Sequence, residues 1–269
     1  MPLGYRGDYF RPEPPSTGRV TKHLIFITMG AYILQLLLVR SSPMAIAALG
    51  LRADWAFKGA VWQFVTYMFL HGGILHLIFN MLVLWWFGTI VEGSFGRTRF
   101  LEVYFGAGVF GGLVQALVNF VWGPQNALVL GCSGGILGLL VVCAFIVPHM
   151  TVFLSFIIPV KMRTMVMLFI FLDLCMALRH ERTETAVWAH LGGAGFGFFY
   201  YRVLYKRGIM LTGFWRDLRR KLASMGGSGA DVSDKEVDRI LLKIGRDGIQ
   251  SLTRRERKIL MRASKQKKK

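Results

Sequence analysis

The chain has 269 residues, of which 54% are apolar or aromatic and 18% are charged. Counted with glycine in place of tyrosine, the apolar share is roughly 62%, whereas a soluble domain has about 45–50%. This composition excludes an ordinary soluble globule. The net charge is +18, and residues 202–269 hold 20 of the 33 lysines and arginines. Because this basic excess adjoins long apolar stretches, we expect it to face anionic lipid, and we expect no nucleic-acid partner.

Six apolar stretches are long enough to cross a bilayer, which takes about 17–25 helical residues. They cover residues 23–39, 68–91, 100–121, 131–147, 162–178 and 186–205. The sequence therefore predicts an all-α membrane protein with six transmembrane helices. The preceding segment, residues 1–22, is polar and includes Pro12, Pro14 and Pro15, so we expect no cleavable signal peptide and take the first stretch as the insertion signal.

The connecting segments predict the orientation. Residues 1–22, 92–99, 148–163 and 202–269 together carry 28 lysines and arginines, against five in the remaining connections. Cytoplasmic segments are the ones enriched in these residues, so both termini should be cytoplasmic. The sequence therefore predicts three units: a cytoplasmic segment 1–22, a six-span domain 23–205 and a basic cytoplasmic tail 206–269.

The segment between the first two stretches, residues 40–67, is too interrupted by polar residues, proline and glycine to span. Its tryptophans and phenylalanines suit the membrane interface, so we expect it to lie along the outer leaflet.

The tail contains three short helical patterns. Phe214, Trp215, Leu218 and Leu222 recur at helical spacing among basic residues, which favours an interfacial helix on an anionic leaflet. After a GGSG stretch, two capping-box patterns, Ser233 to Glu236 and Thr253 to Glu256, each predict the start of a helix. This last unit is too small for a robust core of its own. We expect this unit to dock on a partner or on the membrane, or to make no stable contact.

Polar side chains at membrane depth are costly, which makes them functional candidates. The candidates are His71, His76, Asn80, Gln115, Asn119, Ser133, Asp173 and His190. Taken singly, each is more often a packing residue or an interhelical hydrogen-bonding group. The three cysteines, Cys132, Cys143 and Cys175, have no metal-type spacing, which excludes a disulfide framework or zinc cluster. We expect no metal and no organic cofactor.

The predicted topology gathers some of these candidates in the outer half of the membrane. His71, His76, Ser133 and His190 all lie early in stretches that enter from the outer side, and Asn80 shares a helix face with His76 because four residues separate them.

Small residues should let the fourth and sixth stretches approach closely and so bring Ser133 near His190. These residues are Gly131, Gly135, Gly138, Gly193 and Gly197.

This cluster has the parts of a serine hydrolase. A serine hydroxyl needs a base to take its proton, and imidazole is the usual one near neutral pH. The oxyanion that forms needs hydrogen-bond donors. The backbone N–H groups from Gly131 to Ser133, with the side chains of His76 and Asn80, are the candidate donors.

Four stretches of the chain resemble the rhomboid family of intramembrane serine proteases. They are HGGILHLIFN at 71–80, GTIVEGSFG at 88–96, GCSGG at 131–135 and AHLGGAGFG at 189–197. The resemblance implies a six-helix rhomboid bundle without cofactor, in which single-span membrane proteins are cut through an acyl-enzyme. We therefore expect an enzyme of a prokaryotic plasma membrane.

Carried over by residue, the resemblance implies Ser133 as nucleophile and His190 as general base, with no acid required. It implies His76 and Asn80 as the oxyanion-hole side chains. Gly131 resembles the glycine that shapes this loop, and His71 resembles a structural histidine at its mouth. Glu92 and Gly96 resemble a motif that ties the second and third spans together.

Some positions depart from the family pattern. Gln63 follows Trp62 where the family has arginine, which should loosen the first outer segment. Leu137 stands where several members stack an aromatic residue on the catalytic histidine, so the base should be held less rigidly. Cys132 adjoins Ser133, but successive helical positions point about 100° apart.

Asp173 lies outside the resemblance. It orients a polar partner, lines a gap for substrate entry, or is a paired or protonated acid without a catalytic role.

Two other functions compete with proteolysis. An inactive relative would capture membrane helices, and loss of Ser133 or His190 would favour it. A transporter or channel would need polar residues through the inner half of the membrane, where Leu82–Trp86 and Leu139–Val142 are apolar.

Overall fold

A computed structural model describes residues 18–154, 157–178 and 186–206, with Leu211 and a few positions between 239 and 260. The chain divides into two compact units, Met1–Gly213 and Phe214–Lys269. Most of the predicted N-terminal segment, the connection 179–185 and the predicted interfacial helix after residue 212 lie outside the described residues.

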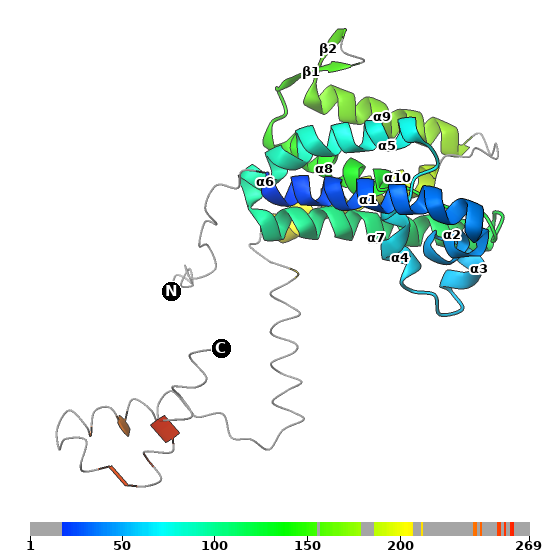
Figure 1. The fold of residues 1–269 in the computed structure, drawn as a ribbon. Helices are drawn as coiled ribbons and strands as arrows, with labels where there is room; N and C mark the ends of the chain where they lie inside the picture. Colours follow the sequence, from blue (N-terminus) through cyan, green and yellow to red (C-terminus); the bar gives the residue numbers. More distant parts are fainter. Residues whose placement is uncertain are drawn as a thin grey trace. The chain divides into compact units, whose positions relative to one another are not determined.

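The first unit is a bundle of helices (Figure 1). Its longer helices are α1 (Arg19–Ser41), α5 (Ile74–Val83), α7 (Arg97–Val121), α8 (Ser133–Ile146), α9 (Met162–Leu178) and α10 (Val187–Phe199). Helix α5 continues through the π-helical η3 (Leu84–Gly88) into α6 (Thr89–Phe95), and α10 continues into the π-helical η4 (Tyr200–Tyr205). Each predicted apolar stretch thus contains a helix. Residues 19–39, 74–95 and 97–121 form helices that are long and apolar enough to cross a membrane, and α8 is a shorter apolar helix.

Short helices fill the segment between α1 and α5, and Figure 1 shows α2, α3 and α4 together at one end of the bundle. They are α2 (Pro43–Leu49), α3 (Ala53–Ala56), α4 (Gln63–Thr66) and the 3-10 turn η2 (Tyr67–Phe69). Leu51 and Val129 exchange backbone hydrogen bonds, which join this segment to the α7–α8 loop. The Arg52 side chain pairs with Asp54 at 2.7 Å, and this hydrogen bond holds the pKa of Asp54 below its usual value.

Gln63 anchors this segment, so the expectation that it loosens the segment was wrong. The side chain is fully buried. Its amide donates to the carbonyls of Ala47 and Ala48 at 3.1 and 3.3 Å, and its oxygen accepts the Arg52 N–H at 3.1 Å. A neutral amide therefore links three backbone groups.

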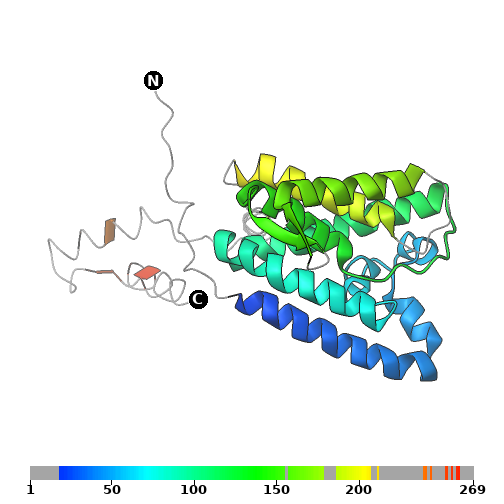
Figure 2. The same cartoon turned by 90° about the horizontal axis from the view of Figure 1, so that it is seen from above.

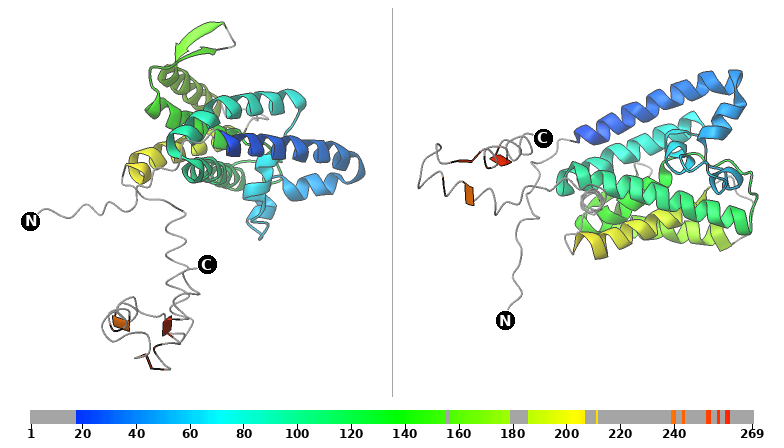
Figure 3. Two further views of the ribbon diagram at one scale, coloured as in Figure 1. Left: turned by 60° about the vertical axis from the view of Figure 1, so that its left-hand side comes forward. Right: turned by 90° about the horizontal axis from the view of Figure 1, so that it is seen from below.

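A hairpin stands where the sequence analysis placed only a connection. Strands β1 (Thr151–Leu154) and β2 (Ile158–Lys161) pair antiparallel, with Thr151 opposite Lys161. Figure 3 shows the hairpin standing away from the helices. The strands are rich in β-branched residues, which favour this conformation, but each is too short to be recognised by its pattern.

Glycines set the spacing at the centre of the bundle, between α8 and α10. A Cβ on Gly193 would collide with Gly134, and one on Gly197 would collide with the backbone of Gly138. Gly135 instead faces the backbone of Tyr104 on α7. The predicted close approach of these helices is confirmed, although Gly134 rather than Gly135 contributes to it.

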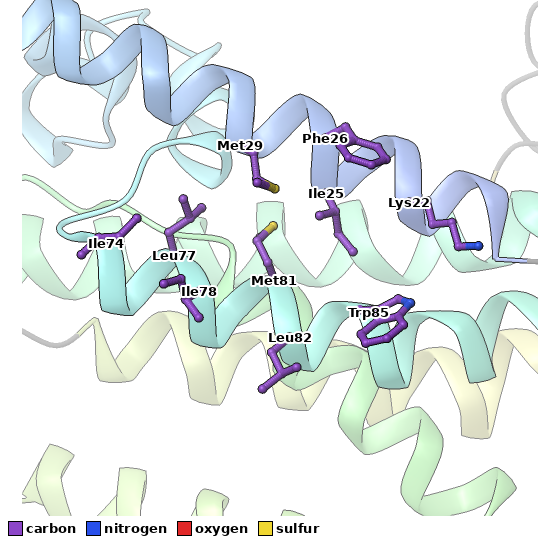
Figure 4. Close-up of a pocket in the computed structure, with 10 residues that line it drawn as sticks. All are labelled: Lys22, Ile25, Phe26, Met29, Ile74, Leu77, Ile78, Met81, Leu82 and Trp85. Atoms are coloured by element: carbon purple, nitrogen blue, oxygen red, sulfur yellow. The ribbon is translucent and has the colours of Figure 1, made fainter.

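Helix α1 lies along one edge of the bundle, beside α5 (Figure 2). A groove of about 660 Å³ runs between them. Figure 4 shows side chains of both helices converging on it, including Met29 and Met81. Lys22, at one end, is the one charged residue among those lining the groove.

Polar contacts fasten the N-terminal end of α1. Glu92 accepts the backbone N–H groups of Val20 and Thr21 at 3.1 and 2.8 Å and the Thr21 hydroxyl at 2.7 Å. A carboxylate at a helix N-terminus satisfies amides that lack an intrahelical acceptor. These bonds of Glu92 reach the first helix, whereas the resemblance implied a tie between the second and third. Gly96, with a φ of 80°, forms the turn from α6 to α7.

Candidate active site

Ser133 and His190 come together between the N-terminal ends of α8 and α10. Ser133 is the first residue of α8, and His190 is in the first turn of α10. The Ser133 hydroxyl oxygen lies 2.7 Å from Nε2 of His190. This distance suits proton transfer from the hydroxyl to the imidazole.

The loop before α8 is shaped by Gly131. Its φ of 124° is rarely adopted by residues with a side chain, and a Cβ there would lie 2.9 Å from Cε1 of His76. The Gly131 N–H donates to the Tyr67 carbonyl at 3.0 Å, so it is already used. The expected oxyanion donors therefore reduce to the N–H groups of Cys132 and Ser133, at the first turn of α8, where amides lack an intrahelical acceptor.

Asn80 and His76 lie one turn apart on α5, which packs against α8. His76 is half-buried beside Gly131. Asn80 is buried, and its side-chain nitrogen has no hydrogen-bond partner within the part of the chain that the structure describes. A buried amide donor without a partner is costly. Asn80 is therefore a candidate donor for an acceptor that the described residues do not supply.

His71 precedes α5 instead of lying within a span as expected, because Gly72 and Gly73 delay the start of the helix until Ile74. It is fully buried, and its ring lies 5.2 Å from that of His76. Gln35 of α1 holds its backbone on both sides, accepting the N–H at 2.9 Å and donating to the carbonyl at 2.7 Å. Sequence reasoning missed Gln35, although it is an amide inside an apolar stretch.

Cys132 does not address the same site as Ser133. Its side chain is fully buried, and its sulfur lies 3.6 Å from Nε2 of His71. The expectation that the two adjacent residues point in different directions is confirmed.

Two further candidates lie on α7. The Gln115 oxygen accepts the N–H of Ala189, the residue before His190, at 3.2 Å, and its amide donates to Asn119 at 2.9 Å. Gln115 thus holds the first turn of α10 in place. The expected interhelical role of Gln115 is confirmed, while the described bond of Asn119 stays within α7.

Asp173 on α9 reaches the other nitrogen of His190, with 3.2 Å between Oδ1 and Nδ1. Sequence reasoning named Asp173 without this partner. Among the described residues, no cluster of three or more histidine, cysteine or acidic side chains is placed to hold a metal ion.

In a comparison with known proteins, two family models match parts of the chain. A family model described as the rhomboid domain matches residues 58–207, more than half of the chain. A second model, of a family of unknown function (DUF6576), matches residues 232–266.

Several curated proteins are similar over parts of the chain. The rhomboid protease GluP of Bacillus subtilis is 42% identical over 83 residues, which are 31% of this chain and 15% of GluP. RHOMBOID-like protein 12, mitochondrial, of Arabidopsis thaliana is 30% identical over 51% of this chain and 44% of its own length. The presenilin-associated rhomboid-like protein A, mitochondrial, of Danio rerio is 28% identical over 60% of this chain and 43% of its own. The chain thus spans less than half of each of these relatives.

Proposed function

Because the chain belongs to the rhomboid family, we propose that it is an intramembrane serine endopeptidase with Ser133 as nucleophile and His190 as general base. Family and apolar helices together make it an integral membrane protein. The observation that carries the proposal is the 2.7 Å contact between the Ser133 hydroxyl and Nε2 of His190.

The reaction follows from these positions. The Ser133 oxygen attacks the carbonyl carbon of the scissile bond while its proton passes to Nε2 of His190. The oxyanion is stabilised by the Ser133 and Cys132 N–H groups and by Asn80 and His76. Collapse breaks the C–N bond, and His190 returns the proton to the leaving amine. Water then attacks the acyl-enzyme, gives a proton to His190 and releases the carboxylic acid, and Ser133 recovers its proton.

The proposal also covers the membrane topology, the substrate class and the location of the protein. We propose that six helices span the bilayer in a domain of residues 23–205, that both termini are cytoplasmic, and that the site opens to the outer side. The substrates are single-span membrane proteins, and the basic tail of residues 206–269 attracts anionic lipid. We propose a prokaryotic plasma membrane as the location, whereas two of the three relatives described above carry mitochondrial names.

Cleavage of a single-span substrate by the purified protein in liposomes tests the proposal. We expect product from the parent and none above background from Ser133→Ala or His190→Ala. Matched controls are Ser94→Ala and His149→Ala, because both side chains are exposed and lie outside the site. These variants should cleave as the parent does.

Two outcomes would overturn the proposal. Cleavage that persists in Ser133→Ala would remove the assigned nucleophile. A parent that binds several single-span substrates without cleaving any would support the alternative, a catalytically inactive rhomboid relative that captures membrane helices.

A further inference from the structure

Asp173 is the one acidic residue of α9, and its sequence neighbours are apolar. Its neighbours Phe171, Leu172 and Leu174 are exposed apolar side chains, while the Asp173 side chain is only 15% exposed. A carboxylate at membrane depth is costly unless it is paired. Within the described parts of the chain, its hydrogen-bond partner is Nδ1 of His190, at 3.2 Å.

This contact determines which nitrogen of His190 carries the proton. When the Asp173 carboxylate carries no proton it only accepts hydrogen bonds, and Nδ1 then donates its N–H to it. In the neutral imidazole, Nε2 is then the acceptor, and Nε2 is the nitrogen 2.7 Å from the Ser133 hydroxyl. Asp173 thus favours the one tautomer that can take the Ser133 proton.

We propose that Asp173 is a positioning residue for His190, so that Ser133, His190 and Asp173 act as a hydrogen-bonded series of three. The inference rests on the proposed function, because it concerns the same reaction. Neither the residue spacing nor the family resemblance assigned Asp173 this role.

The contact strengthens during the reaction. Before attack, the imidazole is neutral and makes an ordinary hydrogen bond to the carboxylate. Once His190 holds the Ser133 proton, an imidazolium faces the carboxylate across the same 3.2 Å. Interactions that are stronger in the transition state than in the ground state accelerate the chemical step. Asp173 should therefore act on kcat, with little effect on KM.

The backbone next to His190 has a separate support. Gln115 accepts the N–H of Ala189 at 3.2 Å, a contact that fixes the backbone and does not involve the ring. Leu137, on α8, is buried and offers no polar group to the ring. Asp173 supplies the remaining constraint.

Kinetics in liposomes with a single-span substrate test the inference. Asp173→Asn should lower kcat by about 10²-fold or more, as expected when a catalytic histidine loses its orienting carboxylate, with KM within about twofold. Asp173→Glu, which retains the carboxylate, should recover part of the lost kcat. Asp54→Asn is the matched control, because it replaces another carboxylate that contacts neither Ser133 nor His190, and it should retain parental kcat.

The tautomer provides a readout that does not depend on turnover. With ¹⁵N-labelled histidine, the NMR signals of His190 should show the proton on Nδ1 in the parent and a shift of population towards Nε2–H in Asp173→Asn and Asp173→Ala. Assignment uses the signals lost in His190→Ala. Thermal unfolding of each variant is measured alongside, and a change in tautomer without a change in unfolding temperature excludes a merely structural role.

The two measurements separate failure of the inference from failure of the proposed function. If the parent cleaves and Asp173→Asn retains parental kcat, the inference is overturned while the protease assignment stands. If the parent does not cleave, the proposed function fails and the tautomer decides the inference: Nδ1–H that shifts in Asp173→Asn supports it, and an unchanged tautomer overturns it.

Discussion

At the residue scale, Asn80 is a buried amide that the proposed reaction would use as a donor. Its buried nitrogen lacks an acceptor among the described residues, and a donor in this state contributes nothing to folding. An oxyanion next to Ser133 would supply the missing acceptor. The cost is then recovered in the transition state.

We expect Asn80→Ala to lower kcat by about 10²–10³-fold, the usual effect of removing one oxyanion donor, while KM changes little. Steady-state kinetics on the single-span substrate measure this. Asn126→Ala, at an exposed position of the α7–α8 loop, should leave kcat unchanged. An Asn80→Ala enzyme with parental kcat would mean that the donors lie elsewhere.

The sequence predicted part of this site. The proximity of Ser133 and His190 followed from the glycine pattern, and the structure has them 2.7 Å apart; their catalytic roles stay predictions. The partner of Asp173 could not be predicted, because it depends on how α9 is rotated against α10, and periodicity does not specify that rotation. The use of the Gly131 N–H by Tyr67 likewise depends on a loop conformation.

At the element scale, the glycine contacts of α8 and α10 hold Ser133 and His190 together. Gly193 has no room for a Cβ because the Gly134 carbonyl lies against it. A methyl group there would push the helices apart, and overpacking of this kind costs about 1–3 kcal/mol. The shift would also lengthen the contact between Ser133 and His190.

We expect Gly193→Ala to lower both the unfolding temperature in detergent and the cleavage rate. Gly195→Ala is the matched control on the same helix, because no atom lies within 4 Å of the site of its added Cβ. This control should behave as the parent or slightly more stably, since alanine is a better helix former. Equal stability of the two variants would contradict the packing argument.

A substitution of Glu92 tests how the start of α1 is held. In Glu92→Gln an amide group replaces one acceptor oxygen, so a donor at the start of α1 loses its partner, at a cost of about 1–3 kcal/mol. We expect a lower free energy of unfolding in mixed detergent titrations, with Ser94→Ala on the same helix as an unaffected control. A parental free energy for Glu92→Gln would show that α1 is held mainly by its other contacts.

The elements differ in how well the sequence predicts them. Long apolar stretches gave the main helices, because crossing a membrane requires length and hydrophobicity that are visible in the sequence. The hairpin β1–β2 and the helices α2 to α4 were not predicted, because they are short and depend on tertiary contacts. The predicted capping box at Thr253 is confirmed. The N–H and the hydroxyl of Thr253 donate to the Glu256 carboxylate at 2.8 and 2.9 Å, and the Glu256 N–H donates to the Thr253 hydroxyl at 3.3 Å.

At the scale of the whole molecule, the proposed orientation in the bilayer would decide on which side of the membrane the proposed cleavage occurs. We expect a fluorescent protein fused after Lys269 to fold and fluoresce in the cytoplasm. A cysteine introduced at Gln125, in the exposed α7–α8 loop, should react with a membrane-impermeant maleimide added outside intact cells, in a background where Cys175 is replaced by serine. Labelling of Gln125→Cys only after the cells are opened would contradict this orientation.

The central claim is that His190 activates Ser133 as a nucleophile, and covalent labelling tests it most directly. The purified protein is treated with a fluorophosphonate in liposomes, and the modified residue is identified by mass spectrometry. We predict one adduct, on Ser133, that is lost in Ser133→Ala and strongly reduced in His190→Ala, with the exposed Ser94 unlabelled. An unlabelled Ser133 in a protein that still cleaves its substrate, or equal labelling in His190→Ala, would contradict the claim.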